Sequence, residues 1–204
     1  MPRVAVLGNI GSGKTELAEA LADRLGWRLA GEPVQVWRAD GFLAAFYDDP
    51  NRYALAFQQY AFATRRLEYS LYAGVPNVVF DSHVATDPAF VAANVDTGGM
   101  TQLEASWYAR TYDAWERFGE PCAPDLYLFL AVAPQICRDR ASARGREEET
   151  AVPLSYFEAL DRNLRLRVRE LEPRIEIDGS LDKEKVLEAA EAACRELLRS
   201  EDGK

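Results

Sequence analysis

Short apolar runs alternate along this chain with longer stretches in which apolar residues recur at helical spacing. The apolar runs fit buried strands and lie at residues 4–7, 27–30, 77–81, 126–130 and 175–178. The helical patterns lie at residues 17–21, 41–47, 52–72, 88–95, 101–117, 134–143, 153–171 and 183–198. Strands that alternate with helices are typical of a parallel sheet covered by helices. We therefore expect an α/β fold with a doubly wound, five-stranded parallel sheet in a single domain, residues 1–204.

The most informative stretch lies between the first strand and the first helix. It reads Gly8, Asn9, Ile10, Gly11, Ser12, Gly13, Lys14 and Thr15, which matches the phosphate-loop pattern G-x-x-x-x-G-K-[ST]. Glycines let the backbone amides close around a phosphate at the positive end of a helix. Lys14 adds a charge for the outer phosphates, and the Thr15 hydroxyl is a Mg²⁺ ligand in such loops. The stretch predicts a site for a nucleoside triphosphate.

Composition narrows the class of substrate. The 204 residues include 24 Lys and Arg against 33 Asp and Glu, which gives a net charge of −9 and a pI near 4.8. Such a chain lacks the basic surface of nucleic-acid-binding proteins, so we expect a small substrate and no nucleic acid. Cys122, Cys137 and Cys194 lack metal-ligand spacing and are expected to be reduced thiols in a cytoplasm. We expect no signal peptide before the first strand and no membrane-spanning segment.

Two carboxylates follow predicted strands. Glu32 comes after the second strand and precedes Pro33, and Asp81 ends the third strand. In open parallel sheets ligands bind at the carboxyl ends of the strands. Glu32 is therefore a candidate base for the proton of an attacking hydroxyl group, with a surface turn residue as the alternative. Asp81 has the position of a second carboxylate that organises Mg²⁺.

Arginines gather where a predicted helix ends in a loop. Arg140, Arg144 and Arg146 precede three glutamates, and a spacing of four puts the first two on one helical face. On a mobile lid, guanidinium groups can neutralise a phosphoryl group during transfer. The alternative is an ordinary solvated face of mixed charge. Beside a phosphate loop, the lid is the better interpretation.

The long helix at residues 52–72 carries a second set of polar candidates. Gln58, Phe62 and Arg65 are spaced so that they share one face. An amide and a guanidinium group beside a ring suit the edge and the flat face of a nucleobase. Periodicity alone leaves open that these are the outward polar residues of an amphipathic helix.

Together these motifs resemble the deoxyribonucleoside kinases over nearly the whole chain. The motifs are the phosphate loop, Glu32-Pro33, Phe57-Gln58-Gln59-Tyr60-Ala61 with Arg65, residues 81–87, Arg144-Gly145-Arg146-x-Glu148-Glu149 followed by Pro153-Leu154-x-Tyr156, and Ile177-Asp178-Gly179-Ser180. The phosphate loop is shared by many families, whereas the Phe-Gln-x-Tyr-Ala helix and the Arg-Gly-Arg lid are far more discriminating. The resemblance implies a P-loop kinase fold with an arginine-rich lid at about residues 140–150, which we call the arginine segment.

The resemblance also implies roles on the acceptor side. Glu32 resembles the base that takes the 5′-hydroxyl proton. Phe57 resembles the ring that packs on the nucleobase, and Gln58 resembles its hydrogen-bond partner. Arg65 and Asp87 resemble an Arg–Asp pair that reads the far side of the base.

Further roles implied by the resemblance concern the sugar and the donor. Tyr47 resembles the tyrosine that holds the 3′-hydroxyl, and Glu149 resembles its partner on the lid. Arg140, Arg144 and Arg146 resemble lid arginines that embrace the donor phosphates. Lys14, Arg140, Arg144 and Glu32 are thus the catalytic candidates.

Residues 81–87 bear on specificity and contain one departure from the family. The Arg65–Asp87 pair favours a purine deoxynucleoside, with deoxycytidine second, because thymine offers no exocyclic amine to an acid. Many members read acid-Arg-Ser after the third strand, whereas this chain reads Asp81-Ser82-His83. Ser82 cannot supply the charge of that arginine. His83 is either a donor near the reacting phosphate or a structural imidazole.

The sequence as a whole predicts an ATP- and Mg²⁺-dependent kinase of nucleotide salvage. It would phosphorylate the 5′-hydroxyl of a deoxyribonucleoside, and the resemblance suggests a homodimer through long helices, to which residues 53–72 could contribute. Two alternatives stay open. One is a P-loop kinase of another small acceptor, such as a nucleoside monophosphate. The other is a module that binds a deoxynucleotide without turnover.

Overall fold

A computed structural model describes residues 2–119 and 123–202 and contains one parallel sheet of five strands in the order β2-β3-β1-β4-β5. The strands are β1 (Arg3–Gly8), β2 (Arg28–Ala30), β3 (Val78–Asp81), β4 (Leu126–Ala131) and β5 (Arg174–Asp178). Their register pairs Val6 with Asp81 on one side and with Leu128 on the other. The predicted α/β fold with a five-stranded parallel sheet is confirmed.

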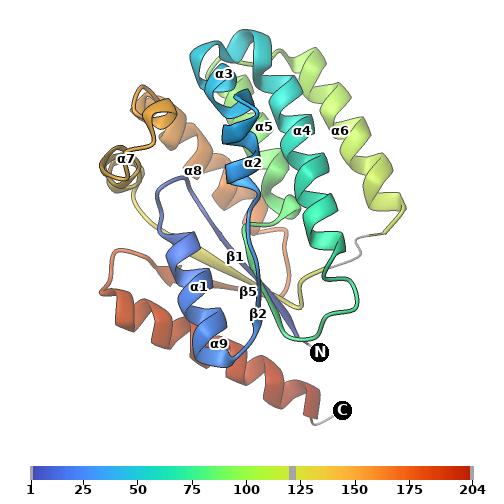
Figure 1. The fold of residues 1–204 in the computed structure, drawn as a ribbon, viewed down its shortest axis with the longest axis vertical. Coiled ribbons are helices and arrows are strands. Elements are labelled where there is room, and N and C mark those ends of the chain that lie inside the picture. Colours follow the sequence, from blue (N-terminus) through green and yellow to red (C-terminus); the bar gives the residue numbers. More distant parts are fainter. Residues whose placement is uncertain (1, 120–122, 203–204) are drawn as a thin grey trace.

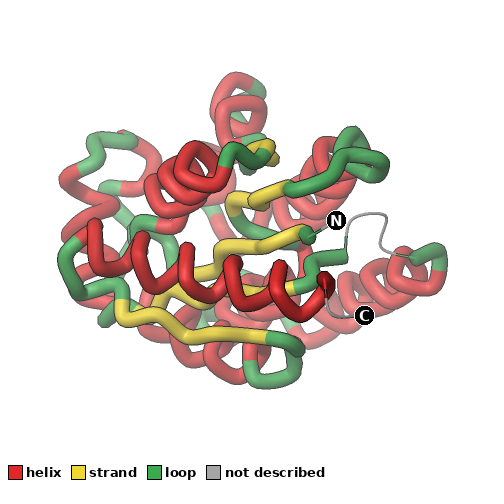
Figure 2. The backbone as a smooth tube through the Cα atoms, turned by 90° about the horizontal axis from the view of Figure 1, so that it is seen from below, coloured by secondary structure: helices red, strands yellow, loops and turns green. Residues whose placement is uncertain are grey.

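Helices cover both faces of this sheet (Figures 1 and 2). They are α1 (Lys14–Leu25), α2 (Val34–Ala39), α3 (Phe42–Asp48), α4 (Pro50–Ser70), α5 (Asp87–Asp96), α6 (Gln102–Arg117), α7 (Pro134–Ala143), α8 (Leu154–Val168) and α9 (Lys183–Asp202), with the 3₁₀ turns η1 (Val84–Thr86) and η2 (Glu147–Glu149). The two cores follow from the pleat of β1, because alternate residues of a strand point to opposite faces. Val4 and Val6 pack toward α1, α7 and α9, whereas Ala5 and Leu7 pack toward α4, α5 and α8.

The long helix α4 begins two residues before the predicted start. Asp49 caps it by accepting a hydrogen bond from the Arg52 amide, and Pro50 occupies the first turn, where no amide donor is needed. The capping box of Thr101 and Glu104 likewise fixes the start of α6. The sequence did not predict α2. Its few residues carry too short a pattern, and its place depends on the buried Trp37.

Two of the cysteines lie in the core. Cys137 and Cys194 are free and buried, and burial raises the pKa of the Cys137 thiol to about 11. Cys122 lies outside the described residues. Within the described ranges, none of the helices has the length and apolar character needed to cross a membrane, and no group of three or more His, Cys, Asp or Glu side chains could hold a metal ion.

Candidate active site

The carboxyl ends of three adjacent strands bring the main candidates together. β1 leads into the glycine loop, β3 ends at Asp81, and β2 is followed within two residues by Glu32. Because β3 lies between β2 and β1, Asp81 stands between the loop and Glu32 along this edge. The edge is therefore the centre of the site, as the order of the strands requires.

The glycine loop has a backbone that only glycine can supply at two positions. Gly11 has φ +71°, and a Cβ there would lie 2.2 Å from the Cys137 carbonyl oxygen. Gly13 has φ +97° and caps the start of α1. The buried Asn9 fixes the loop from below, because its side-chain amide donates to the Phe157 carbonyl at 2.9 Å. The loop is therefore packed closely against Cys137 of α7 and Phe157 of α8.

A cavity of about 750 Å³, here called the outer cavity, opens on this loop. Its lining includes the loop residues Gly11, Ser12, Gly13, Lys14 and Thr15, the turn residue Gly179, and the charged residues Glu16, Arg140, Arg144, Arg146, Lys183 and Glu184. Arg140 donates to the Ser12 carbonyl at 3.1 Å and to the Gly179 carbonyl at 3.3 Å, so it joins the loop to the turn after β5. The volume and the cationic lining suit an anionic ligand of nucleotide size.

A second and much smaller cavity, the inner cavity, lies on the other side of Lys14 and has a volume of about 70 Å³. Its lining comprises Ile10, Lys14, Thr15, Glu32, Val34, Trp37, Leu43, Phe46, Tyr47, Phe57, Gln58, Ala61, Arg65, Phe90, Arg144, Arg146, Glu149 and Tyr156. The structure thus gathers Glu32, Tyr47, Phe57, Gln58, Arg65 and Glu149 around one space, as the sequence predicts. Four residues, Lys14, Thr15, Arg144 and Arg146, line both cavities.

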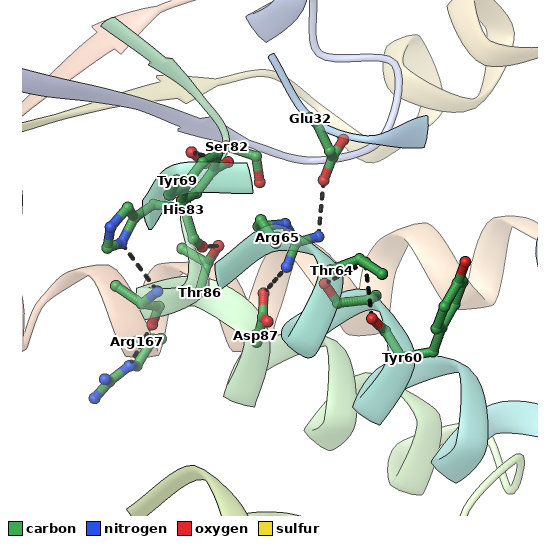
Figure 3. A network of polar contacts seen from close by, with 12 residues as sticks. Glu32, Tyr60, Thr64, Arg65, Tyr69, Ser82, His83, Thr86, Asp87 and Arg167 are labelled. Carbon is green, nitrogen blue, oxygen red and sulfur yellow. Dashed lines mark hydrogen bonds and ion pairs between the residues drawn. The ribbon is translucent and has the colours of Figure 1, made fainter. Parts of the chain in front are cut away.

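Arg65 lies between two acids behind this cavity (Figure 3). It donates to Glu32 at 2.8 Å and forms an ion pair with Asp87, which does not line the cavity itself. All three side chains are largely buried, and the guanidinium group also packs on the Trp37 ring at 5.2 Å. One guanidinium group therefore pairs with two carboxylates in a buried region. The interaction energy between charges is larger there than at a solvent-exposed surface.

The pKa values of these two acids diverge for that reason. Burial raises the pKa of Glu32, but the charges of Arg65 and Lys14 outweigh it, so this pKa lies below its usual value. Burial raises the pKa of Asp87 to about 7, because Arg65 offsets only part of the desolvation and Glu32 adds a like charge. Glu32 is thus the ionised member of the pair at neutral pH.

Asp81 is the third acid of the site. Burial and the neighbouring Glu32 raise its pKa to about 6, while Lys14 and Thr15 act in the opposite direction. Its Oδ1 is buried and accepts no hydrogen bond among the described residues. A carboxylate oxygen left in this state beside Thr15 is suited to a cation.

The arginine segment is closed on itself. Glu149 accepts a hydrogen bond from Arg146 at 3.0 Å and forms a second ion pair with Arg144. Its carboxylate is buried, whereas both arginines are partly exposed. An acid of the chain therefore holds the two guanidinium groups that sequence analysis assigns to donor phosphates.

The base-reading face of α4 differs in one residue from the predicted one. Phe57 lines the inner cavity and stacks on Phe46 with ring centroids 4.8 Å apart. Phe62, predicted to share a face with Gln58 and Arg65, instead packs on Tyr112 at 5.4 Å, toward α6. At about 100° per residue, Phe62 lies some 40° beyond Gln58 on the side away from Phe57. This small rotation decides which ring faces the cavity.

Residues 82 and 83 have structural contacts. The Ser82 carbonyl accepts from the Tyr69 hydroxyl at 2.9 Å, and Ser82 has φ +73° in a buried turn. His83 accepts from the Ala85 amide at 3.1 Å and stacks on the Tyr69 ring, with centroids 5.8 Å apart (Figure 3). Since neither residue lines either cavity, the structural interpretation of His83 is favoured.

Sequence reasoning gave no role to Trp37, Phe46 and Tyr156, all of which line the inner cavity. Tyr156 belongs to the motif after the arginine segment, and its hydroxyl lies 3.5 Å from the Asn94 amide. That motif could have suggested it. Trp37 lies on the unpredicted helix α2 and offered no such signal.

Comparison with known families gives one consistent result. The model of a family described as deoxynucleoside kinase matches residues 4–199. A probable deoxycytidine kinase of fowlpox virus is 32% identical over 161 residues, which cover 78% of this chain and 68% of that protein. A deoxyguanosine kinase of Dictyostelium discoideum is 34% identical over 161 residues, covering 76% of this chain and 54% of that longer protein.

Solved structures agree in fold. A deoxyadenosine kinase from M. mycoides with bound dATP has a TM-score of 0.86 and 22% identity, and the match covers 95% of this chain and 99% of that one. A structure of the same enzyme with bound dCTP has a TM-score of 0.83 and 23% identity over the same shares. At these identities the likeness shows the fold.

Proposed function

The chain belongs to the deoxynucleoside kinase family and is a phosphotransferase that acts on a deoxynucleoside, and we propose that it transfers the γ-phosphate of ATP to the 5′-hydroxyl of a purine deoxynucleoside. One observation carries this proposal. Lys14 and Arg144 line both cavities, so a phosphoryl group that passes between them stays beside positive charge throughout. The outer cavity then takes the donor, and the inner cavity takes the acceptor.

Glu32 is the proposed base. The Arg65 and Lys14 charges hold its pKa below the usual value, so it is an ionised acceptor at neutral pH. In the proposed reaction its carboxylate takes the 5′-hydroxyl proton as the hydroxyl oxygen attacks phosphorus. Most of the rate enhancement then comes from alignment and charge, because phosphoryl transfer needs little covalent help.

Arg65 can replace the charge that is missing at position 82, where many family members have an arginine. Ser82 brings no charge to the site, but Arg65 reaches Glu32 at 2.8 Å from α4. We propose that this guanidinium group supplies the positive charge beside the 5′-hydroxyl, while its other terminal nitrogen pairs with Asp87. The catalytic set is then complete without an arginine at position 82.

Magnesium fits the residues present. The buried Asp81 Oδ1 has no hydrogen-bond donor in the described parts of the chain, and the Thr15 side chain lies beside Asp81. We propose that these two side chains hold the ion, directly or through water. When bound, Mg²⁺ neutralises charge on the donor phosphates.

The Arg65–Asp87 pair supports a base with an exocyclic amine or an acceptor edge, which favours deoxyadenosine or deoxyguanosine, with deoxycytidine second. At a pKa of about 7, Asp87 can offer either a proton donor or an acceptor. The similar proteins include deoxycytidine, deoxyguanosine and deoxyadenosine kinases, whose named substrates all carry an exocyclic amine, and this supports a base of that kind.

We further propose a homodimer through α4 and α6, which lie side by side (Figure 1). Apolar side chains are exposed on both helices or their ends, namely Leu67, Leu71, Leu103, Trp107, Trp115 and Phe118. Leu67 is 68% exposed and Phe118 84% exposed, and large exposed patches of this kind mark association surfaces. Light scattering across a range of concentrations tests this, and a monomer throughout would contradict it. Cytoplasmic location stays a prediction.

A phosphorylation panel tests the reaction. Purified protein, Mg²⁺ and labelled ATP are incubated with deoxyadenosine, deoxyguanosine, deoxycytidine and thymidine separately. Preference for one of the first three supports the kinase and the Arg65–Asp87 pocket. Thymidine as the best substrate would keep the kinase and overturn the pocket. Transfer only to monophosphates, or tight binding without product, would replace the proposal by one of the two alternatives.

A further inference from the structure

The short helix α2 connects the proposed base to the rest of the site. It starts two residues after Glu32, with Pro33 at its N-cap. Trp37 fixes it against α4, because its indole donates to the Thr64 hydroxyl at 2.8 Å and its ring meets Phe57 edge-on at 5.6 Å. The direction of α2 is therefore determined by the same residues that surround the inner cavity.

The next residue of α2 reaches across to the arginine segment. Arg38 donates from Nε to the Glu148 carboxylate, an ion pair between residues 110 positions apart. Arg38 is 38% exposed and Glu148 is 11% exposed. Partial burial raises the pKa of Glu148, but a backbone hydrogen bond and the Arg38 contact outweigh it and leave this pKa below its usual value. The carboxylate is thus ionised and committed to Arg38.

Glu148 lies close to the inner cavity, so its contact with Arg38 affects the lining of that cavity. It lies in η2 between Arg146 and Glu149, and both of those neighbours line the inner cavity. With a volume of about 70 Å³, that cavity is far smaller than the few hundred Å³ typical of a site for a small molecule. A deoxynucleoside can enter only when part of the lining moves away.

We propose that the Arg38–Glu148 ion pair is a latch that holds the arginine segment over the inner cavity. The inference rests on the proposed function in one respect, namely that the inner cavity takes the acceptor. Glu149 holds Arg144 and Arg146 within the segment, whereas Arg38 holds the segment to α2. The latch therefore joins the segment to the helix that follows the base, and Arg38 acts as a positioning residue.

The expected effect is modest because the pair is partly exposed. Pairs of this kind shift an equilibrium roughly two- to fivefold. The latch thus favours the closed segment without locking it. Loss of the latch leaves the segment open more often, so an acceptor enters more readily. The open molecule must still close around its acceptor before transfer.

The rate of trypsin cleavage measures how often the arginine segment is open in the free protein. It cleaves after Arg144 and Arg146, which requires the segment to leave its place. Arg38→Gln and Glu148→Gln should each accelerate these two cleavages roughly two- to fivefold, as identified by fragment mass. The double variant should be no faster than either single variant. Arg24→Gln is the matched control, because Arg24 is 37% exposed and pairs with Glu184 between α1 and α9.

Kinetics give the second readout. For Arg38→Gln the acceptor KM should fall roughly two- to fivefold with kcat unchanged or lower, because the closed segment excludes the acceptor, whereas a merely structural residue would lower both activity and thermal stability. The charge swap Arg38→Glu with Glu148→Arg should restore the acceptor KM. Cleavage at the control rate in Arg38→Gln, additive acceleration in the double variant, or no rescue by the swap would overturn the latch. The trypsin measurement needs no turnover. It therefore tests the latch even if the protein does not catalyse the proposed reaction.

Discussion

The outer and inner cavities differ in size and in what the backbone contributes to them. The outer cavity has about 750 Å³, and the glycine loop from Gly11 to Thr15 lines it together with side chains of α1, α7, the arginine segment and α9. The inner cavity has about 70 Å³, and side chains from α2, α3, α4, η2 and α8 converge on it. The outer cavity thus includes a glycine loop and has room for a ligand, whereas the side chains of the inner cavity fill most of the space they surround.

The charged side chains divide only in part between the two cavities, because Lys14, Arg144 and Arg146 line both. In the inner cavity the charges already have partners, since Glu32 holds Arg65 and Glu149 holds Arg144 and Arg146. An acceptor must therefore exchange these contacts for its own, whereas a donor meets only those of Arg144 and Arg146, which line both cavities. The difference teaches that, under the proposed function, discrimination between acceptors lies in the cost of rearranging the inner cavity.

The largest expected effect comes from the inner cavity. Glu32→Gln removes the proposed proton acceptor, so kcat should fall by about 10²–10⁴-fold. Nucleoside binding should stay largely intact, because the amide keeps the shape of the side chain, and ATP binding in the outer cavity should not change. Steady-state kinetics and calorimetric titration with each ligand measure this. Loss of nucleoside binding together with kcat would show that Glu32 mainly binds or supports the site.

A test on the outer cavity concerns the rigidity of its backbone. Gly11→Ala places a Cβ 2.2 Å from the Cys137 carbonyl oxygen at φ +71°, and should lower the free energy of unfolding by about 2–5 kcal/mol through strain and overlap. Gly26→Ala is the control, because Gly26 has φ +67° and nothing within 4 Å of an added Cβ. Its cost should be about 1–2 kcal/mol. The free energy of unfolding is measured with urea. If both variants lose the same amount, the loop shifts enough to avoid the overlap with Cys137.

The third prediction concerns pH and the buried acids of the inner side. Burial raises the pKa of Asp87 from an ordinary value of 3.8 to about 7. The folded protein therefore holds an additional proton between these values, and Asp87 loses its contribution to stability as pH rises through that window. The Tm of the wild type minus that of Asp87→Asn should fall from about pH 5.5 to about pH 7 and then level off. A difference that grows with pH would show that Arg65 keeps Asp87 ionised.

The same division explains what sequence could predict. The loop and the strand that precedes it are local features, so the pattern from Gly8 to Thr15 sufficed for the outer side, and the alternation of strands and helices sufficed for the sheet. The Arg65–Asp87 pair followed from a family resemblance. The contact of Arg65 with Glu32 could not be predicted, because it requires α4 and the end of β2 to be placed together.

Contacts between distant short elements were equally out of reach. The helix α2 is too short for a periodic pattern, and Arg38 meets Glu148 only because the fold brings η2 to it. Closure of the arginine segment onto Glu149 needed the structure as well, since a run of mixed charge is as compatible with a solvated face. The catalytic and binding roles of all these residues stay predictions until the variants are measured.

The smallest expected effect separates two rings of α4. Phe57→Leu removes a ring that lines the inner cavity and should raise the acceptor KM roughly two- to tenfold, because aromatic contacts contribute about 0.5–1.5 kcal/mol. Phe62→Leu is the matched control. Its ring packs on Tyr112, away from the cavity, so it should lower Tm and leave that KM unchanged.

The donor KM for ATP should stay the same in both variants, since neither ring lines the outer cavity. Acceptor and donor KM values are measured for both variants together with their Tm. These values show whether Phe57 alone contributes to acceptor binding. A rise in acceptor KM for Phe62→Leu as large as that for Phe57→Leu would mean that packing between α4 and α6 shapes the inner cavity. The contrast between an outer side with a glycine loop and a side-chain-built inner side would then extend to the second layer of helices.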